Sequence, residues 1–317
     1  MQKRRNCISV NSEIPKNITP MENKSKINRF SNFPLTKIFI GLVAVVVATG
    51  AIQAGAQAIL KYTSINEDFQ NLTVAILTAT AAMVTYYFLF RFYEKRKIDE
   101  LSTSHFLSNS VTGFFTGFLF LSVVILVMYL GKSYTILSFN PVSFLIPALA
   151  IGISSAAFEE ILFRGIIFRI TEEKLGSVWA LIISSSFFGF AHLANENSTI
   201  FSAVAITIEA GLFLGAAYIY SRNLWLPIFI HFAWNFSEGG IYGAIISGSG
   251  LEKSLINNKI SGPELLTGGA FGPENSLQSV ILGLLIGILF LWMANNKNNL
   301  VKPYWKQPKI DISKSET

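Results

Sequence analysis

Long, nearly uninterrupted runs of apolar residues limit what this chain can fold into. A helix needs about 20 mostly apolar residues to cross the hydrocarbon layer of a bilayer. Runs of about that length recur along the sequence, and charged, glycine or serine residues separate them. The sequence therefore predicts an all-α integral membrane protein, a bundle of about eight transmembrane helices. The predicted spans are 38–60, 71–93, 111–130, 142–168, 177–194, 200–220, 224–247 and 277–294.

The composition excludes the main alternatives to a membrane protein. Charged residues make up 14% of the chain and hydrophobic residues 51%, whereas a soluble domain has about 25% charged residues. The single cysteine, Cys7, excludes an internal disulfide. A net charge of +6 is compatible with nucleic-acid binding, but the basic residues lie mostly in the tails and loops. That placement indicates an anionic lipid surface, so we expect the lipid bilayer as a partner and no nucleic acid.

The basic residues also predict the orientation of the chain. The expected organisation is a basic tail at 1–37, a membrane domain at 38–294 and a second basic tail at 295–317. With eight spans, both tails and alternate loops lie on one side, which carries 20 of the 25 Lys and Arg residues, and the other side carries 4. Because positively charged loops stay in the cytoplasm, we predict a multi-pass cell-membrane protein with both termini cytoplasmic.

Ionisable side chains nevertheless fall within several predicted spans. An ionised side chain at the bilayer centre costs about 2.5–3.5 kcal/mol even on a lenient scale, so such residues face the protein interior and are functional candidates. A position at the end of a span is less costly, and we expect Glu238 to be solvated there. Glu209 lies among small residues, where we expect it to pair with a neighbouring helix. The set is Glu159, Glu160, Arg164, His192, Glu209, His231 and Glu238.

Helical spacing gives these residues a geometry. Residues four apart share a helix face, so Glu160 can pair with Arg164, which leaves Glu159 on a different face. Phe188 and His192 share a face, as do His231 and Asn235.

Depth along the helices can also be compared. A turn centred near Leu175 places Glu159 and His192 level, each roughly 25 Å along its helix. His231 lies only nine residues beyond Arg222, and this count alone makes it shallower.

The chemistry that this grouping supports is hydrolysis. A glutamate in an apolar site suits the role of general base. His192 and His231, with Glu159 and Asn235, are also plausible ligands for Zn²⁺. The sequence contains no HExxH helix and no GxSxG elbow, which excludes a zincin-type site and the usual serine-hydrolase turn.

Three motifs in chain order resemble one membrane family. They are Glu159-Glu160 with Arg164, Phe188 with His192, and His231 with Asn235, and they read EExxxR, FxxxH and HxxxN. This series is similar to the CPBP family, which comprises the type II CAAX prenyl endopeptidases and their bacterial relatives, also called the Abi family. The resemblance covers about residues 140–245. It implies an eight-helix membrane bundle with an active-site cavity among the core helices.

The resemblance also implies a role for each motif residue. Glu159 would activate the attacking water with His192 as its partner. His231 and Asn235 would polarise the scissile carbonyl or hold a metal ion. Glu160 and Arg164 would be supporting residues, as would Phe188. The residues permit either a bound Zn²⁺ or a metal-free mechanism with a glutamate-activated water.

A further stretch in a predicted outer loop, residues 268–276, looks like one in bacterial members of the family. Its glycines and proline would form a tight turn that positions Glu274. The roles of Glu209, Glu238 and Glu274 stay open at this point, as does the role of Met21 as an alternative start.

The sequence therefore favours an intramembrane endopeptidase of the bacterial plasma membrane, acting on a membrane-associated protein or peptide. The alternative is a non-catalytic membrane protein that provides bacteriocin self-immunity or acts as a scaffold for a membrane partner. A transporter is a weaker option, because intramembrane charges also mark ion paths. The substrate, its side of entry and the oligomeric state are open.

Overall fold

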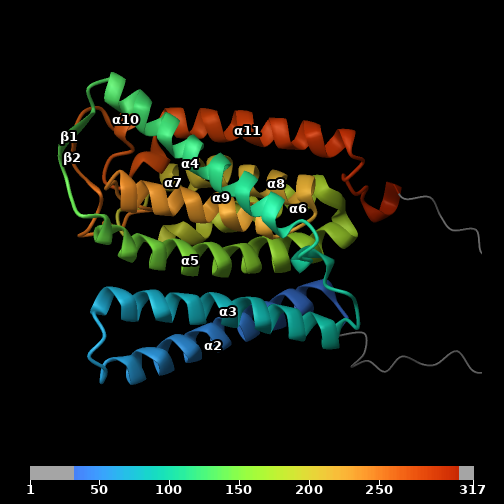
Figure 1. Ribbon diagram of the computed structural model, residues 1–317. Helices are drawn as coiled ribbons and strands as arrows, with labels where there is room; N and C mark the ends of the chain where they lie inside the picture. The colour runs from blue at the N-terminus through green and yellow to red at the C-terminus, as the bar shows by residue number, and fades with distance from the viewer. Residues whose placement is uncertain (1–31, 307–317) are drawn as a thin grey trace, which may run out of the picture.

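The computed structural model describes residues 32–306, and within that range it is a bundle of long helices (Figure 1). The outer parts of both predicted tails, 1–31 and 307–317, lie outside the described residues. The helical hairpin of α2 and α3 lies along one side of the bundle next to α5, and α11 lies on the opposite side (Figure 1). The predicted all-α membrane fold is confirmed, and a small two-stranded sheet is added to it.

The first three long helices match the predicted spans closely. They are α2 (Pro34–Leu60), α3 (Glu67–Tyr93) and α4 (Phe106–Leu130). Pro34 lies in the first turn of α2, where its missing N–H group costs nothing because an amide there has no partner within the helix. The Asn66 side chain accepts a hydrogen bond from the amide of Asp68 and so caps α3.

The fourth and fifth predicted spans form one helical stretch that folds back on itself. The 3₁₀ turn η2 (Val142–Leu145) leads into α5 (Ile146–Glu160), which continues as the π-helix η3 (Ile161–Phe168) and then as α6 (Arg169–Ala191). Gly176 reverses the chain within α6, with φ 76° and ψ 170°, a backbone conformation that glycine adopts readily.

The next helices are interrupted by π-helical turns. The sixth span contains α7 (Ile200–Ile206), the π-helix η5 (Thr207–Leu212) and α8 (Phe213–Ser221). The seventh contains α9 (Trp225–Asn235) and the π-helix η6 (Phe236–Ile241), and the eighth is α11 (Leu277–Asn296). The predicted end of the seventh span at residue 247 is wrong. The helix ends at Ile241, because the chain turns at Gly243 with a φ of 64°.

By length and composition, six helical stretches in the described part of the chain are long and apolar enough to cross a membrane. One of them, residues 142–194, is the stretch that Gly176 folds into two arms. The 11 residues of α9 and the 6 of η6 are just too short to qualify alone. The number of eight spans therefore stays a prediction.

Loops predicted to lie on the same side meet at the same end of the bundle. At the end away from the tails, β1 (Tyr134–Phe139) pairs antiparallel with β2 (Ile256–Ile260), with an irregular register between Ile136 and Ser138. There Lys253 also binds Asp68, at 2.6 Å. Short helical turns complete the described chain; they are η1 (Asp99–Leu101), η4 (His192–Ala194), α10 (Glu264–Thr267), η7 (Pro273–Asn275) and η8 (Tyr304–Lys306).

The tail-side loops are joined by ion pairs and hydrogen bonds. Glu94 binds both Lys37, at 3.1 Å, and Arg169, at 2.9 Å. Arg222 binds Glu172 and the backbone carbonyl of Asn299. These contacts tie the start of α2, the ends of α3, α8 and α11, and the turn at Gly176 together at one end, as the alternation of the loops predicted. The side of the membrane on which this end lies stays a prediction.

Close helix packing brings α4 against α9. A Cβ on Gly117 of α4 would overlap the carbonyl oxygen of Ile230, and a Cβ on Gly113 would lie 2.7 Å from the carbonyl oxygen of Leu226. Small residues that allow backbones to approach this closely are the usual means of packing helices in membranes. The glycines of α4 therefore fix the position of α9, which carries His231 and Asn235.

We predict that Gly117→Ala destabilises the protein by about 1–3 kcal/mol, because the added methyl group must displace α9. The matched control is Gly50→Ala in α2, where an added Cβ meets nothing within 4 Å. Thermal unfolding of the detergent-solubilised protein measures both variants. Equal melting temperatures for the two would contradict the packing argument.

A second prediction concerns acid stability at the tail-side end. Burial alone would raise the pKa of Glu94, but Arg169 and hydrogen bonds from Lys37 and Arg96 outweigh it, so the net pKa lies below the ordinary 4.5. Burial would also raise the pKa of Glu100, but Arg96 outweighs it, so this pKa too lies below its ordinary value. A lowered folded-state pKa contributes stability above the unfolded pKa, and this is lost as the pH falls through the folded pKa.

The free energy of unfolding of the wild type should therefore fall as the pH drops below about 4.5. Glu94→Gln should make this acid dependence shallower, whereas Glu67→Gln, at an exposed acid, should leave it unchanged. Denaturant unfolding as a function of pH measures the slope. An identical slope in wild type and Glu94→Gln would show that the network does not govern acid stability.

Candidate active site

Four of the predicted site residues line one cavity of about 410 Å³. Glu159, His192, His231 and Asn235 all face it, although they come from three different helical segments. Polar backbone and side chains from the loops complete the wall. The remaining lining residues are Ile151, Ser155, Ala194, Asn195, Glu196, Ile246, Ser247, Ser249 and Gly250.

Helical periodicity selects which side chains of α5 and α9 reach this cavity. Ile151, Ser155 and Glu159 follow one another at intervals of four and form one face of α5. His231 and Asn235 form the corresponding face of α9. The acid and the imidazole therefore meet because two helices with polar stripes pack face to face.

The arms on either side of Gly176 place Glu159 level with His192. Ser184 donates a hydrogen bond to the carbonyl of Phe163, at 2.8 Å, and the rings of Phe163 and Phe188 lie 5.0 Å apart. Phe163 lies 13 residues before Gly176 and Phe188 lies 12 residues after it, so the two arms run antiparallel.

His231 reaches the same level because its own turn lies deeper in the bundle. Leu224, at the start of α9, is fully buried, and its Cδ1 atom lies 3.5 Å from where a Cβ on Gly165 would be. Gly165 is 11 residues before Gly176, so the turn between α8 and α9 sits well inside the tail-side end. The sequence count made His231 shallow because it assumed that all turns lie at one depth.

A buried ion pair lies behind the cavity. Arg164 Nη1 donates to Glu160 Oε1 at 2.7 Å, and Glu160 and Arg164 are 0% and 1% exposed. Arg164 Nη2 donates to the carbonyls of Ala210 and Gly211 at 3.1 and 3.0 Å. The guanidinium carbon lies 4.6 Å from the centroid of the Phe188 ring. The predicted i,i+4 pair is present, and Phe188 supports it.

His231 connects this ion pair to the cavity. Its Nδ1 lies 3.1 Å from Glu160 Oε1, and its Nε2 lies 3.9 Å from Glu159 Oε2. With Nδ1 donating to the carboxylate, Nε2 is directed toward the Glu159 side. Among the described residues, Oε2 of Glu159 and Oε2 of Glu160 both lack a hydrogen-bond partner, but the Glu159 side chain is 24% exposed whereas that of Glu160 is 0% exposed. Glu159 is therefore the acid of the doublet that can reach a substrate or water.

The other two predicted residues are also oriented by a single neighbour. His192 Nδ1 lies 2.8 Å from the carbonyl oxygen of Phe188, an arrangement in which Nδ1 donates and Nε2 carries a free lone pair. Asn235 Nδ2 donates to Ser155 Oγ at 2.9 Å. The structure gives no direct contact between His192 and Glu159, and His231 is the imidazole paired with that acid.

The two histidines of the cavity share a feature of metal ligands. Nδ1 of each ring lies within hydrogen-bond distance of an oxygen acceptor, an arrangement that is typical of zinc-binding histidines. However, no group of three or more His, Cys, Asp or Glu side chains within residues 32–306 is placed to hold a metal ion. A bound Zn²⁺ at His192 and His231 therefore stays a prediction.

A second acidic group lies close to the outer loops. Glu209 accepts from Ser279 Oγ at 2.7 Å, Glu238 from Trp234 Nε1 at 3.2 Å, and Glu274 from the amide and hydroxyl of Ser247. All three acids are at most 4% exposed. The expectation that Glu238 is solvated is wrong, because η6 buries it beneath the loop that carries Glu274.

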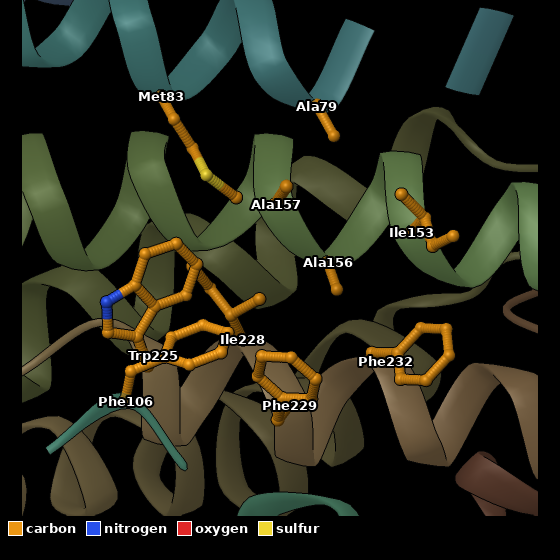
Figure 2. Close-up of a pocket in the computed structure, with 10 residues that line it drawn as sticks. All are labelled: Ala79, Met83, Phe106, Ile153, Ala156, Ala157, Trp225, Ile228, Phe229 and Phe232. Carbon is orange, nitrogen blue, oxygen red and sulfur yellow. The ribbon is translucent and has the colours of Figure 1, made fainter. Parts of the chain in front are cut away.

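A separate apolar cavity of about 380 Å³ lies on other faces of α5 and α9 (Figure 2). Helical spacing again determines which residues line it. Ile153, Ala156 and Ala157 lie on a different face of α5 from the residues that line the polar cavity. Aromatic rings close the opposite side in Figure 2. The other lining residues are Ala79, Met83, Phe106, Trp225, Ile228, Phe229 and Phe232.

Sequence reasoning missed several polar residues of the cavity that Glu159 lines. Ser155 precedes Glu159 by four residues and Asn195 follows His192 by three, so helical spacing carried a signal for both. Ser247 and Ser249 lie in a loop with no periodicity, and their distance from the motifs gave no indication of contact.

Comparison with known proteins agrees with the geometry. Residues 141–237 match the family model of the type II CAAX prenyl endopeptidase Rce1-like proteins. This segment contains all four motif residues of the cavity, and it confirms the resemblance predicted from the three motifs.

A curated bacterial protein is similar over part of the same chain. The "Putative membrane peptidase YdiL" of Bacillus subtilis (strain 168) is 35% identical over 79 residues, which are 24% of this chain and 29% of that protein. The chain thus aligns with less than a third of that relative's length. No solved structure matches the chain.

We predict that Arg164→Met strongly destabilises the fold, by about 3–5 kcal/mol, because it leaves the Glu160 carboxylate buried without its partner. The control is Lys97→Met, which removes an ion pair whose side chains are 83% and 68% exposed and should change little. Thermal unfolding in detergent compares the two. The double variant Glu160→Met with Arg164→Met should recover part of the loss, and a still larger loss would contradict the account.

Proposed function

We propose that the protein is an intramembrane endopeptidase that hydrolyses a peptide bond of a membrane-associated protein or peptide. The observation that carries the proposal is the convergence of Glu159, His192, His231 and Asn235 on one cavity. The match to the prenyl endopeptidase family over 141–237 supports the same reaction class.

In the proposed reaction, Glu159 is the general base. Its side chain lines the cavity and is 24% exposed, so the carboxylate can accept a proton from a water molecule there. As the water oxygen attacks the carbonyl carbon of the substrate, its proton passes to Glu159. The acid then returns this proton to the amine nitrogen as the C–N bond breaks, giving a new carboxyl and a new amino terminus. The free Nε2 of His192 accepts a hydrogen bond from the water and orients it.

The carbonyl oxygen gains negative charge in this step and needs donors. Asn235 uses one amide hydrogen on Ser155, and its second can point into the cavity. His231 donates from Nε2 when it is protonated, and Glu160 at Nδ1 stabilises that form. Removing one donor of this kind typically lowers kcat by about 10²–10³.

The proposed substrate is anchored in the bilayer. The apolar cavity beside the catalytic one is lined by hydrocarbon and aromatic side chains and suits the hydrocarbon part of such an anchor (Figure 2). Because α5 and α9 contribute to both cavities, an anchor held in one lies next to the peptide bond presented to Glu159.

We predict that Glu159→Gln lowers the cleavage rate by about 10²–10⁴-fold without unfolding the protein, because it removes the base but keeps the shape. The measurement compares new protein termini in host membranes from wild type, a deletion strain and Glu159→Gln at matched expression. Glu67→Gln, at an exposed acid outside the cavity, is the control and should cleave like wild type.

Termini present in wild type and Glu67→Gln, but lost in the deletion and in Glu159→Gln, would identify both the activity and its substrate. If Glu159→Gln instead gives wild-type termini and rescues the deletion phenotype, catalysis is rejected in favour of a binding role, such as immunity or scaffolding.

Of the two mechanisms, one with a bound Zn²⁺ and one with a glutamate-activated water and no metal, we propose the metal-free one. The metal content of the purified protein tests it directly. Less than about 0.1 zinc per chain, with cleavage that resists a chelator, is the expected result, whereas stoichiometric zinc that is lost in His231→Ala would establish His231 as a ligand.

A further inference from the structure

A tight turn at residues 246–249 forms part of the wall of the catalytic cavity. Ile246 and Ser249 exchange backbone hydrogen bonds of 2.9 and 2.8 Å, and Ile246, Ser247, Ser249 and Gly250 all line the cavity. Both central residues have positive φ, 46° for Ser247 and 89° for Gly248. Residues other than glycine rarely adopt such backbone angles, so contacts with the surrounding residues must hold Ser247 in this conformation.

Glu274 supplies the main contact at this position. Its Oε2 accepts from the backbone amide of Ser247 at 2.8 Å and from the Ser247 hydroxyl at 2.7 Å. Glu274 is 4% exposed and Ser247 is half-buried, so these bonds are largely shielded from water. A buried amide that loses its acceptor bears the full cost of desolvation. One carboxylate oxygen thus binds both the amide and the hydroxyl of the residue that has the left-handed backbone conformation.

The rest of the loop around Glu274 also packs against the turn at residues 246–249. The amide of Gly248 donates to the carbonyl of Phe271 at 2.8 Å. Gly272 has a φ of 116°, and an added Cβ there would overlap the carbonyl oxygen of Ile245. The glycines of residues 268–276 thus allow this loop to lie directly against the turn.

The turn is also connected to both catalytic helices. Asn195, three residues after His192, donates to the carbonyl of Ser247 at 3.0 Å. Glu274 also lies close to Glu238, which is three residues beyond Asn235 and accepts a hydrogen bond from Trp234. A displacement of Glu274 would therefore change the positions of the cavity wall and of the end of α9.

We propose that Glu274 is a positioning residue, which holds the 246–249 turn closed over the outer side of the catalytic cavity through its bonds to Ser247. The proposal rests on the proposed function for the meaning of the cavity, but the closure of the turn is independent of it. Glu274 itself does not line the cavity and takes no part in the chemical step.

The closure can be measured without a substrate. In a Cys7→Ser background, Ile246→Cys places one thiol on the turn, at a position that is 8% exposed. The rate of its reaction with N-ethylmaleimide then reports opening. Thr63→Cys, at an exposed position between α2 and α3, reports general reactivity. The full chain is used in lipid nanodiscs, with Glu252→Ala as the matched exposed-acid control.

Glu274→Ala should raise the labelling rate at position 246 at least about tenfold, the change expected when a buried hydrogen bond to a charged group is lost. Glu274→Gln should stay close to the parent, because its amide oxygen still accepts from Ser247. Labelling at position 63 and the Glu252→Ala variant should not change. If Glu274→Ala does not fold, Ser247→Ala, which removes only the hydroxyl donor, should raise the rate by a smaller factor.

Unchanged labelling in a folded Glu274→Ala protein, or equal increases in the Ala and Gln variants, would overturn the proposal. So would an unchanged rate in Ser247→Ala where that variant is the test. Cleavage in host membranes gives a second readout, which should fall in Glu274→Ala and recover in Glu274→Gln. If the wild type itself cleaves nothing, the proposed function fails while the labelling rates still decide whether Glu274 holds the turn.

Discussion

The arrangement of the bundle depends on the buried pair of Glu160 and Arg164. The pair lies at the point where four helical segments meet, because Arg164 reaches the carbonyls of η5 and the ring of Phe188, and Glu160 reaches His231 on α9. A buried ion pair contributes little net stability once its desolvation is counted. Its effect here is to fix position, because a rotation or sliding of α9 would break the bond between Glu160 and His231, and one of η5 would break the bonds from Arg164 to its carbonyls.

The π-helical segments explain how the carbonyls become available to Arg164. A π-helix shifts the backbone hydrogen bonds by one residue, which widens the turn and often marks functional sites. In the described residues, Arg164 lies in η3, the carbonyls of Ala210 and Gly211 lie in η5, and Glu238 lies in η6. Each of these interruptions coincides with a buried charged side chain or its acceptor. The irregular backbone and the intramembrane charges are therefore parts of one arrangement.

Much of this arrangement could be predicted from the sequence. The lengths of the apolar runs predicted the helices, and the charged loops predicted which helix ends lie together. The i,i+4 spacing predicted the Glu160–Arg164 pair. The depth of His231 could not be predicted, because it depends on the burial of Leu224 against Gly165, a tertiary contact with no local signal. The same holds for the turn at Ser247 and for the burial of Glu238. Both depend on a loop that is remote in sequence and folds back over the bundle.

The doublet of adjacent acids has a physical rationale in this geometry. Glu160 Oε1 is bound by both Arg164 and His231, and the residue is fully buried, so its charge is neutralised and it cannot meet a substrate. Glu159 is one residue further round the helix, where it faces the cavity and lies 3.9 Å from the other nitrogen of the same imidazole. One acid thus contacts Nδ1 of His231 on the side away from the cavity, while the other lies near Nε2 on the cavity side. A single acid at either position could not do both, because the two nitrogens of the imidazole point in opposite directions.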